Sequence, residues 1–152
     1  MNPILLAIPV FLLSIGIEAW IAKRQGKQVY SLSDAITSLN IGVLSQVSGL
    51  FSKLITLGMY AGVYELWAMT QWPLDSVWAW LGALLLYDLC YYWNHRLGHE
   101  VSLLWGAHSI HHSSEYYNLS TALRQSATGF LWSWVFYLPL AIVGIPPKML
   151  VI

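Results

Sequence analysis

The chain has 152 residues, no formal net charge, and a composition that is 57% hydrophobic and only 9% charged. Soluble domains carry about 25% charged residues, so this composition indicates an integral membrane protein. Zero net charge gives no reason to expect a nucleic-acid partner, and the single cysteine, Cys90, excludes an internal disulfide. The length is that of one domain, and we expect residues 1–152 to form a single membrane domain.

Residues 3–22 are apolar and long enough to cross a bilayer. At about 1.5 Å per residue they span a hydrocarbon core that is roughly 30 Å thick. Lys23, Arg24 and Lys27 follow the run, whereas no positive side chain precedes it. Because no small-residue cleavage site follows either, the pattern predicts an uncleaved anchor whose C-terminal end faces the cytoplasm.

Residues 31–52 form a segment that is about half polar. Serine, threonine, asparagine and aspartate alternate there with apolar residues at helical spacing. This pattern predicts either an amphipathic helix at the inner membrane surface or a polar helix packed in a bundle. Of the two, we favour the helix packed against other helices.

Three more apolar segments predict membrane crossings, at residues 54–70, 76–94 and 127–145. The sequence Trp72-Pro73-Leu74-Asp75 predicts a turn between the first two of these crossings. The third crossing is expected to end at Pro146-Pro147.

Six of the seven lysine and arginine side chains fall on one side of the membrane, which the positive-inside rule makes the cytoplasmic side. They are Lys23, Arg24, Lys27, Lys53, Arg96 and Arg124. The sequence therefore predicts an all-α fold, a polytopic membrane helical bundle with a histidine-rich cytoplasmic region at residues 95–125. A bacterial inner membrane or the endoplasmic reticulum would suit such a chain.

All five histidines lie between positions 95 and 112, beyond the end of a predicted crossing. They read His95-x-x-x-His99 and His108-x-x-His111-His112. Imidazole is the commonest metal ligand in proteins, and residues four apart lie on one helix face, one turn above the other. His95 and His99 can thus hold one metal ion, and His108 can pair with His111 or His112 across a turn.

Three polar residues are candidates to support the metal ligands. Asp88 lies within a predicted crossing, on the helical stripe of His95 and His99, where an ionisable group is costly. Its carboxylate could accept a hydrogen bond from an imidazole and so fix the tautomer of the ring, or it could be a satisfied buried carboxylate. Asn118 and Arg124 are the other two candidates, and Arg124 can also be a topology or lipid-headgroup charge.

The residue types leave the metal open. His99-Glu100 begins the zinc-protease pattern H-E-x-x-H, but position 103 is Leu. One cysteine is too few for Cys-rich zinc or iron–sulfur sites, and imidazoles suit iron, zinc, copper or nickel. The chemistry also fits a non-catalytic membrane metal-binding or scaffold protein, and a haem-binding bundle is a third alternative.

Two runs of residues carry a family resemblance: Tyr87-Asp88 with Tyr92-Trp93-x-His95-Arg96-x-x-His99, and Trp105-x-x-His108-x-x-His111-His112-Ser113. Together they resemble the fatty acid hydroxylase/sterol desaturase superfamily. The continuation over residues 115–126 is similar to the alkylglycerol monooxygenase branch and its bacterial relatives. The resemblance is strong over about residues 87–126.

The resemblance implies a membrane-bound oxygenase that uses O₂ and a non-haem di-iron centre to hydroxylate or desaturate a lipid C–H bond, of sterol, fatty acyl or alkylglycerol type. It implies five iron ligands, which are His95, His99, His108, His111 and His112. It also implies an electron donor: tetrahydrobiopterin in the alkylglycerol branch, or an external redox partner in the wider family. Members carry a third box, H-x-x-H-H, whereas no histidine follows His112. We therefore expect this chain to be an incomplete N-terminal part that is inactive alone.

Overall fold

The computed structural model of the chain describes residues 3–150, and all the regular structure within this range is helical. The prediction of an all-α fold is confirmed. Two compact units share the chain: the first comprises Met1–Ser45 and Ser109–Ser126, and the second comprises Gln46–His108 and Ala127–Ile152. The expected single membrane domain stays a prediction.

The first helix, α1 (Pro3–Arg24), covers the predicted anchor. The side chains of residues 3–6 lie outside the described part of the chain. The helix ends at a glycine in the left-handed region, Gly26, with φ 67°. The N–H of Lys27 donates to the carbonyl of Ala22 at 2.9 Å. This hydrogen bond caps the C-terminal end of α1, and the left-handed conformation of Gly26 makes it possible.

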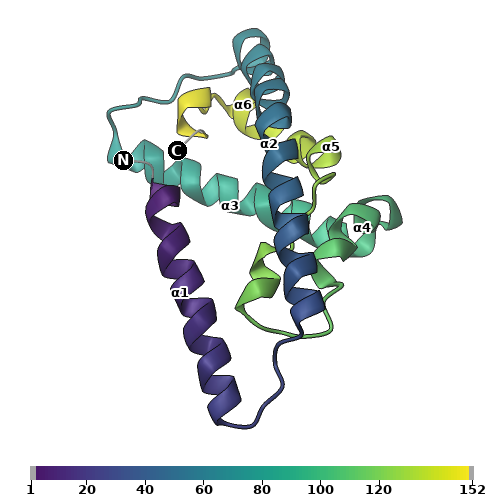
Figure 1. The fold of residues 1–152 in the computed structure, drawn as a ribbon. Coiled ribbons are helices and arrows are strands. Elements are labelled where there is room, and N and C mark those ends of the chain that lie inside the picture. Colours follow the sequence, from purple (N-terminus) through teal and green to yellow (C-terminus); the bar gives the residue numbers. More distant parts are fainter. Residues whose placement is uncertain (1–2, 151–152) are drawn as a thin grey trace. The chain divides into compact units, whose positions relative to one another are not determined.

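The second helix, α2 (Leu32–Trp67), corrects the expected boundary near residue 53. The sequence predicts separate elements at 31–52 and 54–70, but the structure has one unbroken helix (Figure 1). The residues change from polar to apolar near position 53, but α2 contains no proline that would interrupt the helix there. Within residues 3–150, α2 alone is long and apolar enough to cross a membrane, by length and composition.

The helix α3 (Val77–Glu100) begins at the predicted turn and carries the first two histidines. The Ser76 side chain caps it by accepting a hydrogen bond from the N–H of Ala79 at 3.4 Å. It extends past the predicted crossing, so that His95 and His99 lie on the helix itself. After an extended residue, Val101, the short helix α4 (Ser102–His108) packs against α3.

The rest of the chain forms short helical pieces instead of the single crossing expected at 127–145. In chain order they are η1 (Ser109–His112), η2 (Leu119–Leu123), α5 (Phe130–Ser133), η3 (Trp134–Tyr137), α6 (Leu138–Val143) and η4 (Pro147–Met149). Pro139, in the first turn of α6, has no N–H to donate, which separates η3 from α6. The apolar stretch Phe130–Val143 is shorter than the ~20 residues that span a bilayer. The polytopic bundle therefore stays a prediction.

The second unit has a small apolar core where α6 ends. The buried members are Tyr60, Ala83, Leu140, Ala141 and Ile145. The Tyr60 hydroxyl donates to the carbonyl of Ile145 at 2.8 Å, which fixes the chain just after α6. Large apolar side chains nevertheless remain exposed along α1, α2 and α3. Exposed apolar surface on this scale indicates a partner or a membrane around the protein.

The first unit is held mainly by polar contacts. Glu18 of α1 accepts hydrogen bonds from the Tyr30 hydroxyl at 2.5 Å and from the Leu119 N–H at 2.8 Å. Burial and the Glu18 carboxylate raise the pKa of Tyr30 to about 12, so this hydroxyl remains a donor at neutral pH. Helix α2 and η2 approach so closely at Gly42 that a Cβ there would lie 2.6 Å from the carbonyl oxygen of Leu123.

Replacing Gly42 with alanine should therefore destabilise the first unit. The added methyl group meets backbone, which cannot rotate away, and overpacking of this kind costs about 1–3 kcal/mol. Thermal unfolding in detergent measures the effect. Gly49→Ala on the same helix is the matched control, because nothing lies within 4 Å of a Cβ at that position. Equal melting temperatures for Gly42→Ala and the wild type would contradict the close approach.

Candidate metal centre

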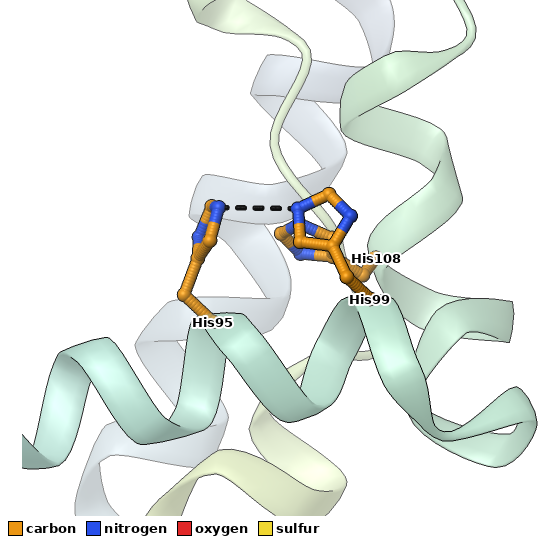
Figure 2. A group of neighbouring side chains, drawn as sticks. All are labelled: His95, His99 and His108. Carbon is orange, nitrogen blue, oxygen red and sulfur yellow. Dashed lines mark hydrogen bonds between the residues drawn. The ribbon is translucent and has the colours of Figure 1, made fainter.

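Three imidazoles converge in the second unit. They belong to His95, His99 and His108, and one ring nitrogen from each lies within 4.8 Å of the other two. Figure 2 shows His95 and His99 rising from one face of α3, with the ring of His108 beside them. His95 and His99 lie side by side on α3, as their four-residue spacing predicts, and His108 joins them from the end of α4. Their role as metal ligands stays a prediction.

The spacing of the nitrogens fits a shared metal ion. The Nε2 atoms of His95 and His99 are 3.3 Å apart, and those of His99 and His108 are 3.2 Å apart. Two nitrogens that bind one ion at about 2.1 Å lie about 3.0 Å apart on an octahedral edge and about 3.4 Å apart on a tetrahedral edge. The two observed separations fall between these values, as expected for pairs of nitrogens that could bind one ion.

A glycine lets α4 come near enough to α3 to deliver His108. Gly98 is buried on α3, and a Cβ at this position would lie 3.2 Å from Cγ of His108. A side chain at this position would require the imidazole to shift by a few tenths of an ångström. Gly98 thus sets the distance between the first two histidines and the third, although the sequence carries no motif that assigns it this role.

Aromatic and charged side chains surround the cluster within the second unit. The ring of Tyr91 lies 5.8 Å from that of His95, and the indole of Trp105 lies 5.7 Å from the ring of His99. A shallow open pocket reaches the cluster and is lined by His99, Glu100, Ser102 and Trp105. Ligands and polar molecules can therefore reach His99 from this side.

The other two histidines belong to the first unit. His111 and His112 lie in η1, with their ring centroids 5.2 Å apart. The Nδ1 atom of His111 is 3.1 Å from the backbone carbonyl oxygen of Arg124. The predicted pairing of His108 with His111 or His112 stays a prediction.

The three candidate supporting residues have different surroundings. Asp88 is exposed on α3, and the cluster of three imidazoles does not include it. Asn118 is buried, where it caps η2 and donates to the carbonyl of Val29 at 2.6 Å. Arg124 is buried and ion-paired with Asp34 at 2.8 Å. A buried, paired guanidinium is a structural group, so this geometry argues against a lipid-headgroup charge at Arg124.

Sequence reasoning missed Asp34, which it treated only as one polar residue of segment 31–52. A signal was present: Asp34 is the only charged residue between positions 28 and 52, and Arg124 is the only lysine or arginine between 97 and 147. In an apolar chain, isolated opposite charges are expected to pair.

The fatty acid hydroxylase family profile matches residues 80–152, a range that includes all five histidines. The predicted resemblance to this superfamily is confirmed, and its match begins in α3, ahead of the histidine pair.

Several relatives of the chain are named alkylglycerol monooxygenase. The chain is 46% identical to that of Homo sapiens and 43% identical to that of Danio rerio, each over 146 residues that make up 94% of the chain and 32% of the relative. It is 37% identical to that of Xenopus tropicalis over 139 residues, 91% of the chain and 31% of the relative. The chain thus spans about a third of the length of these relatives. No solved structure matches it significantly.

Replacing Gly98 with alanine should weaken metal binding by the chain. Alanine favours a helix by about 1 kcal/mol over glycine, so any loss of affinity would come from the displaced His108 ring and not from a weaker α3. Gly106→Ala on α4 is the matched control, because a Cβ there has open space. Bound metal per chain, measured by elemental analysis, should fall only in Gly98→Ala. Equal metal content in both variants would contradict the role of Gly98.

Proposed function

We propose that this chain is part of a membrane-bound, O₂-dependent lipid oxygenase with a non-haem iron centre. The convergence of the His95, His99 and His108 imidazoles is the observation that carries the proposal. Two findings support it: residues 80–152 match the fatty acid hydroxylase family, and the chain is similar to proteins named alkylglycerol monooxygenase. The long apolar helix α2 is consistent with a membrane location.

In this proposal all five histidines contribute to a di-iron centre. His95, His99 and His108 provide three neutral nitrogen donors for one ion, and His111 and His112 add two more ligands to the centre. Imidazole is a good ligand for iron, although it also accepts zinc, copper and nickel. When bound, iron supplies the activation of O₂ that attack on an unactivated C–H bond requires.

The residues around the imidazoles would hold the substrate. The exposed apolar side chains of α2 and α3 offer a surface for an acyl or alkyl chain. Tyr91 and Trp105 flank the imidazoles and would give the substrate chain aromatic surface beside the metal ligands. The names of the relatives favour an alkylglycerol-type lipid.

The remaining elements of the proposal are the electron donor and the orientation. Tetrahydrobiopterin or an external redox protein would supply electrons, and the open pocket beside His99 gives a polar route to the centre. Several crossings, with the histidines on the cytoplasmic side, would place the imidazoles where cytoplasmic reductants reach them. The basic residues at the end of α1, Lys23 and Arg24, support this orientation.

Replacing His108 with alanine tests the proposal. In the full-length protein this change should abolish lipid oxidation and lower bound iron, because one of three converging donors is lost, while membrane insertion persists. Elemental analysis and lipid turnover are the measurements. Gln125→Ala is the matched control, since this side chain is exposed and bonds only to the Ala122 carbonyl among the described residues.

Three other outcomes would contradict the proposal. Wild-type turnover in His108→Ala would defeat the ligand assignment. Bound zinc that does not respond to reductant would favour a non-catalytic metal-binding or scaffold protein. A Soret absorption band would indicate haem in place of non-haem iron.

A further inference from the structure

A buried ion pair ties the start of α2 to the segment that carries His111. The Asp34 carboxylate and the Arg124 guanidinium meet at 2.8 Å, with side-chain exposures of 13% and 5%. The other Asp34 carboxylate oxygen lies 2.6 Å from the Ser114 hydroxyl, which donates to it. A carboxylate removed from water in this way is stable only because both of its oxygens are bonded.

Arg124 is fixed by two further hydrogen bonds. Its Nε donates to the Ser38 hydroxyl at 3.2 Å, and its Nη1 donates to the Ser113 hydroxyl at 2.9 Å. Ser38 is fully buried on α2. With three nitrogens of one rigid, planar group engaged, the Arg124 side chain has a single position, and its backbone is held with it.

The backbone of Arg124 acts on His111. Its carbonyl oxygen lies 3.1 Å from Nδ1 of His111. A carbonyl oxygen only accepts hydrogen bonds, so Nδ1 of the neutral ring must carry the proton and Nε2 must keep the lone pair. A hydrogen bond of this kind to a backbone carbonyl fixes the tautomer and the direction of a metal-binding imidazole.

We propose that Asp34 is a positioning residue for metal binding: by holding Arg124 in place, it keeps the Arg124 carbonyl against His111 and the imidazole lone pair on Nε2. This proposal rests on the proposed function in one respect, the assignment of His111 as a ligand. Asp34 itself contacts neither the substrate nor the metal. Its effect passes through Arg124.

The test replaces Asp34 with asparagine in the full-length, detergent-solubilised protein. Two quantities are measured: the affinity for ferrous iron, and the ¹⁵N spectrum of the metal-free, histidine-labelled protein, which reports the tautomer of His111. We expect a mixed tautomer and a loss of iron affinity of about 10–100-fold. Asp34→Glu, which keeps the charge, should recover part of both. Asp75→Asn is the matched control, because Asp75 is exposed in the turn before α3.

The outcomes separate the two proposals. A folded Asp34→Asn protein with wild-type tautomer and affinity would overturn the role of Asp34. Unchanged iron affinity in His111→Ala would instead overturn the assignment of His111 as a ligand. The tautomer of His111 in Asp34→Asn would then still show whether Asp34 positions this ring.

A milder variant decides the question where Asp34→Asn does not fold. Ser38→Ala removes one hydrogen bond to the Arg124 guanidinium and leaves the ion pair intact. A partial change of tautomer at an unchanged melting temperature would support the positioning role, and a wild-type spectrum would overturn it.

Discussion

The first unit depends on the ion pair between Asp34 and Arg124. Removing two charges from water is costly, and only good geometry with further hydrogen bonds offsets this cost. The Ser38, Ser113 and Ser114 hydroxyls supply those bonds. Breaking one partner of such a pair costs about 3–5 kcal/mol, because the other charge remains buried alone. The unit has few buried apolar side chains to compensate, so this polar network determines how residues 109–126 lie against α2.

The second unit has a different constraint: the imidazoles of His95, His99 and His108 must converge if they are to share a ligand. Helix α3 supplies two of them through its four-residue spacing, which needs no tertiary contact. The third requires a close approach of α4, and Gly98 permits it. The candidate metal centre therefore combines a local contribution from helix geometry with one from packing between two elements.

The sequence predicts the features that depend on local helix geometry and misses those that depend on packing between distant elements. The helical fold, the turn before Ser76 and the proximity of His95 and His99 on one helix follow from local patterns, and the structure has all three. The boundary near residue 53 was wrong because polarity changes there without a helix breaker. The partnership of Asp34 with Arg124 joins residues 90 positions apart, so neither periodicity nor motif could identify it. The interruption of the helix at 127–145 includes Pro139, whose missing N–H hydropathy alone does not detect.

Gly98 has a consequence for local motion. Glycine weakens a helix interior by about 1 kcal/mol relative to alanine, and here it lies between His95 and the end of α3. The last turns of α3 are therefore less stable than they would be with alanine at position 98. An ion that binds only when these turns are folded stabilises the folded form, and the stabilisation grows with the affinity of the ion. Binding of an ion by all three imidazoles would therefore slow amide hydrogen exchange over the last turn of α3 more than over the turns near Ser76.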